Sequence, residues 1–377
     1  MTPDKYIYLH KPLASDEEIQ MVGEAIRSGW IAPGGPYVER FEKELSAYTK
    51  SPYAVALQSG TAALHLILKA LHIQEGDFVI LPTHTFVATA NPVLYEKAIP
   101  VLVDSDQGQI NMSPAYLEEA IKFIISKYQT KPKAIITVHI YGIAAPLKEI
   151  KEIAEKYEIP LIEDAAESMG TFYEHQHTGT FGKFGILSFN GNKIISTSGG
   201  GAVLTHDKEK AEYIRFLSSQ AKEPRPYYYH KEVGYNYQFS NLLAALGMAQ
   251  IKKLPDFLQK KEAIHRYYLK HLNSVPVRIF KDFPGGGTNY WLNIMILDKH
   301  SPGEFIQFME ENGIETRHTW YPLHLMPLFE KYHYFGRNET YEFFRKTVLL
   351  PSGAGLTGNE MEYIIEKIES FFIKNPF

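Results

Sequence analysis

Short, almost wholly apolar runs alternate with segments of helical periodicity between residues 53 and 205. A strand with apolar residues at nearly every position is buried on both faces, and helical segments between such strands are typical of crossovers in a parallel sheet. The pattern therefore predicts an α/β domain built on a mostly parallel sheet. Ahead of it, a capping box of Ser15 and Glu18 predicts a helix that begins near Asp16. The predicted strands are YAVAL (53–57), DFVIL (77–81), IPVLVD (99–104), KAIITVHIYG (133–142), IPLIED (159–164), FGILSF (184–189) and GAVLT (201–205).

The pattern changes after residue 255, where a long amphipathic helix, a strand and two capped helices are expected. This series predicts a smaller α+β domain. We therefore expect a large α/β domain over residues 1–255 and a small domain over residues 256–377, packed closely because no low-complexity linker separates them. The elements of the small domain are LPDFLQKKEAIHRYYLKHL (254–272), NYWLNIMIL (289–297), a helix from Ser301 and Pro302 to Asn312–Gly313, and a helix opened by the Thr357–Glu360 capping box.

Composition excludes several classes of function. The net charge is −4 and the chain has no basic block, so the sequence does not predict a surface that binds nucleic acid. The apolar stretches are too short for a membrane span of ~20 residues, and the first residues lack the apolar core of a signal peptide, so a cytoplasmic location is expected. Cysteine is absent, which excludes disulfides, thiolate catalysis and iron–sulfur centres. The 15 histidines are scattered without a metal-site pattern, so no metal is predicted.

Three segments carry candidate chemistry, and the first is QSGTAALHLILKAL (58–71). It places Ser59, Gly60 and Thr61 between a predicted strand and the first turn of a helix. Free backbone N–H groups and the helix dipole attract an anion at such a place, and a glycine lets a phosphate approach closely. The alternative interpretation is a plain helix cap, because serine and threonine are good N-caps.

The second segment, IPLIEDAAESMG (159–170), ends a predicted buried strand with Glu163 and Asp164. The carboxyl end of a central parallel strand points into the crevice where open α/β sheets bind ligands. An ionised carboxylate buried there needs a cationic partner, and a protonated pyridine ring would be one. The alternative is a carboxylate that caps a following helix.

The third segment, SFNGNKIISTSGGGAV (188–203), presents Lys193 after an Asn190–Gly191 turn at the mouth of the same crevice. A desolvated amine with few anionic neighbours loses its proton more readily, as formation of a Schiff base requires. The glycines at 199–201 let the chain turn back tightly beside a ligand. The alternative is a surface lysine in a hairpin.

The order of these segments is a phosphate loop, then an acidic strand end, then a lysine turn, all within one α/β domain. One molecule of pyridoxal phosphate would use all three. The anion site would hold its phosphate, Asp164 its ring nitrogen, and Lys193 its aldehyde through a Schiff base. The sequence therefore predicts a cofactor enzyme in which Lys193 and Asp164 are catalytic.

Ordered matches over nearly the whole chain resemble the DegT/StrS family of nucleotide-sugar aminotransferases. The resemblance implies the aspartate-aminotransferase-like fold, which is fold type I of the pyridoxal phosphate enzymes. It also implies a homodimer whose active sites are shared between the subunits. The matching stretches are SGWIAPGGPYVERFE, QSGTAALHLIL, LPTHTF, VHIYG, IEDAAES, SFNGNK, GYNYQFSN and WYPLHLMPLF.

The resemblance further implies which residues bind the cofactor. Gly60, Thr61 and Ser188 would contact its phosphate. Asn236 would reach the same phosphate from the other subunit. Phe86 would stack on the cofactor ring, at a position where relatives carry an aromatic residue.

The remaining implied roles concern the chemistry. Asp164 would pair with the pyridinium nitrogen, and Glu167 would approach the ring hydroxyl. Lys193 would form the Schiff base and move the proton between the α-carbon of the amino donor and the cofactor. Trp320 and His324 would line the substrate end of the site.

Within the family, SFNGNKIISTSGGG looks most like enzymes that aminate carbon 4 of a UDP-linked 4-keto-6-deoxy-N-acetylglucosamine for bacillosamine or legionaminic acid pathways. The implied donor is L-glutamate, which would convert the cofactor to pyridoxamine phosphate before the keto sugar is aminated. A GDP- or dTDP-linked keto sugar, aminated at carbon 3 or 4, is the alternative. Gln238, His318 and Tyr321 stand where other residues are common in relatives, so the sugar contacts are expected to differ.

Two other classes of function fit the sequence less well. A sugar dehydratase of the same family would lack the Schiff-base lysine, and one type would use an iron–sulfur centre, whereas here Lys193 is present and cysteine is absent. A non-catalytic protein that binds sugar nucleotides would carry a broken site, yet Lys193, Asp164 and the phosphate loop are all intact. The sequence therefore favours a transaminase.

Overall fold

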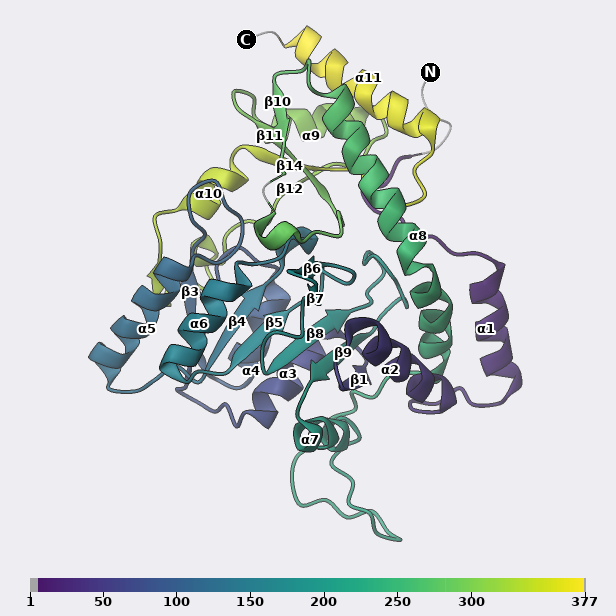
Figure 1. Cartoon of the computed structure of the whole chain (residues 1–377), viewed down its shortest axis with the longest axis vertical. Coiled ribbons are helices and arrows are strands. Elements are labelled where there is room, and N and C mark those ends of the chain that lie inside the picture. The colour runs from purple at the N-terminus through teal and green to yellow at the C-terminus, as the bar shows by residue number, and fades with distance from the viewer. Residues whose placement is uncertain (1–5, 282, 376–377) are drawn as a thin grey trace.

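A computed structural model describes residues 6–281 and 283–375 of the chain. Within this part, eight strands form one large sheet, and β9 is the strand that runs antiparallel to its neighbours. The predicted α/β fold with a mostly parallel sheet is thereby confirmed (Figure 1). In spatial order the strands are β1 (Tyr53–Leu57), β9 (Gly201–Thr205), β8 (Phe184–Ser188), β5 (Leu161–Asp164), β4 (Ala134–Val138), β2 (Phe78–Pro82), β3 (Ile99–Val103) and β13 (Tyr334–Phe335).

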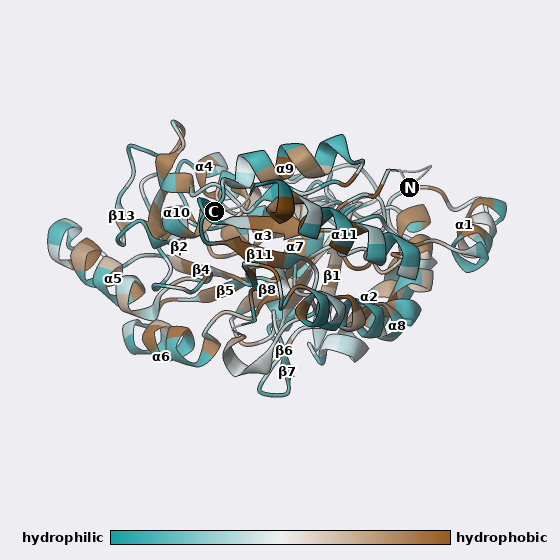
Figure 2. Ribbon diagram, turned by 90° about the horizontal axis from the view of Figure 1, so that it is seen from above, coloured by the Kyte–Doolittle hydropathy of each residue, from teal (hydrophilic) through white to brown (hydrophobic). Residues whose placement is uncertain are grey.

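Helices cover both faces of this sheet, which explains why its strands are apolar at nearly every position. Every residue of β2, β4 and β9 is buried. One cluster of buried side chains joins the sheet to α5 and α6, and another joins it to α3, α4 and α7 (Figure 2). These helices are α3 (Gly60–Ala70), α4 (Asn91–Tyr95), α5 (Pro114–Tyr128), α6 (Leu147–Tyr157) and α7 (Lys208–Ser218).

Both predicted capping boxes are present. Ser15 and Glu18 form the box that opens α1 (Asp16–Arg27), and Thr357 with Glu360 opens α11 (Gly358–Lys374). In each, the side chain of the cap accepts a hydrogen bond from the helix backbone while the glutamate accepts one from the backbone of the cap. The local sequence therefore fixes where these two helices begin.

Helix α8 (Asn241–His271) is longer than predicted, because it continues through Pro255. A proline removes one helical hydrogen bond, but packing along the whole helix outweighs that loss. Its first half packs against α1 and α2 (Pro36–Thr49), and its second half belongs to the core of the smaller domain. Residue 255 thus lies inside a continuous helix, and the division at this residue stays a prediction. No described helix combines the length and the hydropathy that a membrane crossing requires.

The smaller domain has an antiparallel sheet packed on two helices, α9 (Pro302–Glu311) and α11. The two domains exchange chain segments. Ile7, near the N-terminus, bridges to Ile314 of the smaller domain, and β13 returns from the C-terminal region to pair with β3 at the edge of the large sheet. The strands of the small sheet are β10 (Val277–Ile279), β11 (Asn293–Leu297), β14 (Thr347–Leu350) and β12 (Arg317–His318), in this order.

Lys261 of α8 is buried under the small sheet, and this predicts a pH-dependent stability. Burial lowers the pKa of its amine from 10.5 to about 7. Between these values the unfolded chain binds a proton that the folded protein lacks, so the free energy of unfolding rises with pH from about 7 upward. Between pH 7 and pH 9, the free energy of unfolding of the wild type should rise by ~2 kcal/mol more than that of Lys261→Met. Urea unfolding at both pH values measures this difference.

The neighbouring Lys260 supplies the control, because its side chain is 48% exposed and pairs with Asp256. Lys260→Met should follow the pH dependence of the wild type. Equal pH slopes for the wild type and Lys261→Met would contradict the assigned titration.

Candidate active site

A cavity of about 460 Å³ opens at the carboxyl ends of the central strands, and residues of the smaller domain complete its wall. The large domain provides the end of β5, the N-terminus of α3 and the turn after β8, whereas the smaller domain provides Trp291, Arg317 and Trp320. The cavity brings together nine residues that the sequence predicted, which are Ser59, Gly60, Thr61, Phe86, Asp164, Glu167, Ser188, Lys193 and Trp320.

The N-terminus of α3 offers an anion site. Ser59 is the N-cap, and its Oγ accepts a hydrogen bond of 3.0 Å from the amide of Ala62. Within the described part of the chain, the amides of Gly60 and Thr61 have no acceptor. A Cβ on Gly201 would lie 2.4 Å from the nitrogen of Gly60, so a glycine is required where this strand passes the loop. Both interpretations of the segment therefore apply, because the cap leaves two amides and the helix dipole for an anion.

Asp164 ends β5 at the floor of the cavity and is 6% exposed. Its Oδ2 accepts a hydrogen bond of 2.7 Å from the hydroxyl of Thr89, and its Oδ1 accepts one of 3.1 Å from the amide of Ala166. Burial raises the pKa of the Asp164 carboxyl, against the opposing effect of the Thr89 bond. No described lysine, arginine or histidine pairs with it, and no α-helix follows for it to cap. A bound cation is therefore the partner that this carboxylate needs.

Lys193 lies between a carboxylate and an indole ring. Its Nζ is 3.4 Å from Oε1 of Glu167 and 4.3 Å from the centre of the Trp291 ring. The expectation of few anionic neighbours was wrong, because the chain places Glu167 in direct contact with the amine. Burial raises the pKa of Glu167, and the charge of Lys193 opposes this rise. The other oxygen of Glu167 accepts a hydrogen bond of 2.7 Å from the amide of Tyr141, which fixes the carboxylate beside the lysine.

Two aromatic rings form the wall of the cavity towards the smaller domain. Phe86 is 51% exposed, and its ring centre lies 5.3 Å from that of Trp320. The backbone amide of Trp320 donates a hydrogen bond of 2.6 Å to the hydroxyl of Tyr141. The indole nitrogen of Trp320 is buried and has no acceptor among the described residues. A bound ligand that offers an acceptor would satisfy this donor.

Three residues that line the cavity, Thr89, Trp291 and Arg317, were not predicted from the sequence. Thr89 follows the aromatic Phe86 by one short turn, and its hydroxyl binds the catalytic candidate Asp164. Arg317 and Trp291 come from the smaller domain, more than 90 residues beyond Lys193. The position of Arg317 in TRHTWYP, three residues before Trp320, is the signal that could have indicated it.

Two predicted residues do not line this cavity within the described chain. His324 bonds through its ring nitrogens to the side chains of Thr83 (2.7 Å) and Asn338 (2.9 Å), and its ring stacks on Tyr334 at 3.8 Å. It thereby connects β13 to the large sheet. Asn236 is exposed on the segment between α7 and α8. Their predicted roles toward substrate and toward a partner subunit stay predictions.

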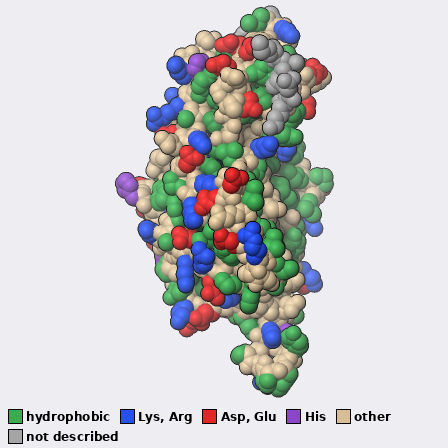
Figure 3. Space-filling model, turned by 90° about the vertical axis from the view of Figure 1, so that its right-hand side faces the viewer, with side chains coloured by type: hydrophobic (Ala, Val, Ile, Leu, Met, Phe, Trp, Pro, Cys, Tyr) green, Lys and Arg blue, Asp and Glu red, His purple; other side chains and the backbone are tan. Residues whose placement is uncertain are grey.

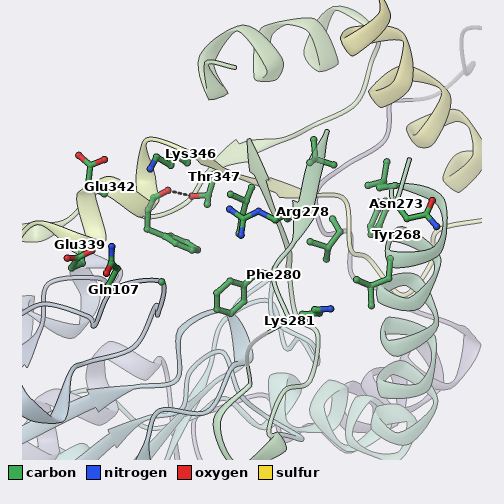
Figure 4. A pocket seen from close by; sticks show the side chains of 17 residues that line it. Gln107, Tyr268, Asn273, Arg278, Phe280, Lys281, Glu339, Glu342, Lys346 and Thr347 are labelled. Carbon is green, nitrogen blue, oxygen red and sulfur yellow. Dashed lines mark hydrogen bonds between the residues drawn. The ribbon is translucent and has the colours of Figure 1, made fainter. Parts of the chain in front are cut away.

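A larger cavity, of about 890 Å³, lies beside the small sheet, but its chemistry differs (Figure 4). Phe280 and Phe343 contribute apolar surface, and charged residues of both signs, such as Arg278 and Glu342, surround it. It contains none of the residues that the sequence predicted for catalysis. The smaller cavity is therefore the candidate active site.

The donor set of the smaller cavity fits pyridoxal phosphate. The α3 N-terminus with Ser188 would hold the phosphate, Asp164 would hold the ring nitrogen, and Lys193 would bind the aldehyde covalently. The distinguishing observation is the buried Asp164, which lacks a cation although Lys193 stands in the same cavity. Fold and site together define an α/β enzyme of the pyridoxal phosphate class.

The chain belongs to the DegT/DnrJ/EryC1/StrS aminotransferase family, whose model matches residues 12–369. It is 44% identical to EpsN of Bacillus subtilis (strain 168), a protein named as a pyridoxal phosphate-dependent aminotransferase, over 98% of this chain and 96% of EpsN. It is 35% identical to the GDP-perosamine synthase of Escherichia coli O157:H7, over 98% of this chain and 99% of that protein.

Among solved structures, the chain is similar to a protein of Streptococcus pneumoniae described as a sugar aminotransferase in its PLP form. The TM-score is 0.91 at 27% identity, over 98% of this chain and 99% of the other. The pyridoxamine phosphate form of the same protein also matches. The chain is thus a pyridoxal phosphate-dependent enzyme of the nucleotide-sugar aminotransferases.

Proposed function

We propose that the enzyme transfers the amino group of L-glutamate to carbon 4 of a nucleotide-linked 4-keto-6-deoxy sugar, with UDP-4-keto-6-deoxy-N-acetylglucosamine as the leading substrate. The observation that carries the proposal is the meeting of the Lys193 amine, the buried Asp164 and the α3 N-terminus in one cavity. The sequence around Lys193 resembles enzymes with this specificity. The unpartnered indole N–H of Trp320 supports an acceptor on the sugar, such as an N-acetyl oxygen.

Each side chain of the site has a separate role in the proposed reaction. When bound, pyridoxal phosphate supplies an electron sink for the negative charge that develops at the α-carbon of the donor. Lys193 Nζ holds and returns the proton at this carbon. The carboxylate of Asp164 would stabilise the protonated form of the ring nitrogen. Thr89 orients this carboxylate by its hydrogen bond. Phe86 and Trp320 would cover one side of the bound cofactor and substrate.

The donor half of the reaction is tested with the purified protein and glutamate alone. Glutamate should replace the absorbance of the lysine-bound cofactor by that of pyridoxamine phosphate. If the spectrum is unchanged with glutamate but changes with another amino acid, that amino acid replaces glutamate as the proposed donor. No change with any amino acid would reject a transaminase.

The sugar half is tested with a panel of UDP-, dTDP- and GDP-linked 4-keto sugars, with the configuration of each product determined by NMR. A GDP-linked keto sugar is the second candidate, because relatives named GDP-perosamine synthase cover nearly the whole chain. The UDP-linked N-acetyl sugar should give the largest kcat/KM. A larger kcat/KM with the GDP-linked sugar would replace the leading assignment.

We also propose that the active unit is a cytoplasmic homodimer in which Asn236 reaches the phosphate site of the partner. The segment between α7 and α8, which carries Asn236, projects from the body of the subunit (Figures 1 and 3). Tyr227 and Tyr228 on this projection are 57% and 80% exposed. Exposed aromatic rings on a projecting segment are favourable for burial against a second copy. Sedimentation analysis of the wild type tests the dimer.

Arg317 is expected to bind a carboxylate of glutamate, because it and Lys193 are the cationic residues among those that line the cavity. Its Nε donates a hydrogen bond of 2.8 Å to Oε1 of Glu315, and its Nη2 lies 2.5 Å from the same oxygen, which leaves Nη1 to meet an anion. Arg317→Met should raise the KM for glutamate about 10- to 100-fold, as expected for a lost charge-assisted contact. Steady-state kinetics with each substrate varied in turn measure this effect.

Arg278→Met is the matched control, because Arg278 pairs with Asp298 beside the larger cavity. It should leave both KM values within twofold of the wild type. A rise in the KM for the nucleotide sugar instead of that for glutamate would assign Arg317 to the diphosphate.

A further inference from the structure

A lysine without an acidic partner is buried behind the active site. Lys261 of α8 is 1% exposed, and its Nζ donates hydrogen bonds to the carbonyl oxygens of Trp291 (3.0 Å) and Ser352 (2.8 Å). In residues 6–281 and 283–375, no carboxylate forms an ion pair with it. A lysine amine buried among neutral groups costs stability whether it keeps its charge or gives up its proton, so its presence calls for an explanation outside stability.

Trp291 connects Lys261 to the reactive lysine. The indole is 1% exposed, and its Nε1 donates a hydrogen bond of 2.8 Å to the carbonyl of Asn192, the residue before Lys193. The Nζ of Lys193 lies 4.3 Å from the centre of the indole ring, within the range of a cation–π contact. Lys261 therefore binds the backbone of the residue whose ring contacts the nucleophile.

The turn that carries Trp291 needs support from outside. Tyr290 has a φ of 53°, in the left-handed region that bulky residues rarely adopt. Such a conformation persists when surrounding contacts hold it. On one side, Asn289 donates hydrogen bonds to the carbonyls of Glu167 (2.9 Å) and Met169 (3.0 Å) and accepts one from the amide of Trp291. On the other side, Lys261 holds the carbonyl of Trp291.

The histidine next to this pair, His10, does not substitute for an acidic partner. His10 lies beside Trp291, with 6.5 Å between the ring centres. Burial, followed by the charges of Lys261 and Lys193, holds the pKa of His10 well below its ordinary value, so the ring is neutral. The N–H groups of Lys261 are thus directed at two carbonyl oxygens, and one of these belongs to Trp291.

We propose that Lys261 is a positioning residue for Lys193: by holding the carbonyl of Trp291, it keeps the indole face against the Lys193 amine. The indole and Glu167 then contact Nζ from two directions, and the amine stays in the cavity when it is not covalently engaged. The proposal rests on the proposed role of Lys193 in proton transfer. It adds a residue of the domain-spanning helix to the set that determines the rate of this step.

The test compares Lys261→Met with the control Lys260→Met in the full chain. Methionine keeps the unbranched apolar stem of the side chain and removes both hydrogen bonds, whereas Lys260 is half exposed and pairs with Asp256. The protein is labelled with 5-fluorotryptophan, and its fluorine NMR signals are assigned by single Trp→Phe variants. In Lys261→Met the signal of Trp291 should shift or broaden, while those of Trp30 and Trp320 stay in place. Lys260→Met should leave all three unchanged.

The kinetic arm measures the half-reaction with glutamate. A misplaced Lys193 should lower its maximal rate about tenfold, with the KM for glutamate within twofold of the wild type. In a Trp291→Phe background, Lys261→Met should lower the rate less than twofold further, because the two residues act through one contact. Lys261→Arg, which keeps charged donors, should restore part of the rate.

Three outcomes would overturn the proposal. They are an unmoved Trp291 signal in Lys261→Met, an equal loss of rate in both backgrounds, and a Lys261→Met protein that does not fold, which would assign Lys261 to stability. The fluorine signal depends on neither the donor nor the sugar. A failure of the proposed substrate is therefore distinguishable from a failure of this inference.

Discussion

Lys193→Ala should abolish transamination while leaving the fold intact. The side chain lines the cavity and is 13% exposed, so its removal costs little packing but takes away the amine that binds the cofactor and moves the proton. A loss of at least about a thousandfold in turnover is expected, since both functions depend on one nitrogen. Borohydride reduction of the wild type, followed by peptide mapping, should find the cofactor on the peptide that contains residue 193.

The control is Lys183→Ala, which removes an exposed lysine ten residues earlier in the chain. It should keep wild-type turnover and the same modified peptide. Measurable steady-state turnover in Lys193→Ala, or a reduced cofactor on another lysine, would refute the assignment on which the proposed function depends.

Asp164→Asn should lower the rate of both half-reactions about 100- to 1,000-fold. The substitution keeps the size of the side chain and an acceptor for Thr89, so the site should remain formed. An amide carries no negative charge, and it cannot favour a proton on the ring nitrogen as a carboxylate does. Single-turnover absorbance changes with glutamate and with the keto sugar measure the two rates.

Glu163, the preceding residue, gives a contrasting variant. Its carboxylate is fully buried outside the cavity and accepts hydrogen bonds from His139 and from the amides of Gly179, Phe181 and Gly182. Glu163→Gln should therefore lower the melting temperature more than Asp164→Asn does, with a smaller effect on the rate per folded molecule. If Asp164→Asn loses stability and keeps its rate, Asp164 has only a structural role.

The sequence predicted the large sheet and its ligand-binding edge well, because both depend on local patterns. Strands buried on two faces must be apolar throughout, and all seven predicted strands are present. Asp164 ends one such strand and Lys193 lies in the turn after the next strand of the sheet, so their meeting at one edge follows from the parallel pairing of these two strands. The helix boundaries at Asp16 and Gly358 were predictable because their capping boxes are local.

Other features depend on contacts that sequence distance hides. Trp291 and Arg317 reach the site only because the smaller domain packs over the strand ends. The continuation of α8 through Pro255 depends on the cores at both of its ends, which outweigh the local preference of proline. The two-residue strand β13 has no recognisable pattern, because its pairing with β3 is set by neighbours such as His324.

The exchange of segments between the domains limits how this enzyme can be dissected. A fragment that ends at residue 255 would lack the edge strand Tyr334–Phe335 of its own sheet, and the complementary fragment would lack Ile7, which is hydrogen-bonded to the backbone of Gly313 and Glu315. Each half would expose unpaired backbone that the other half normally covers. The two domains are therefore parts of one folding unit. Co-expressed halves would have to associate before either could complete its fold.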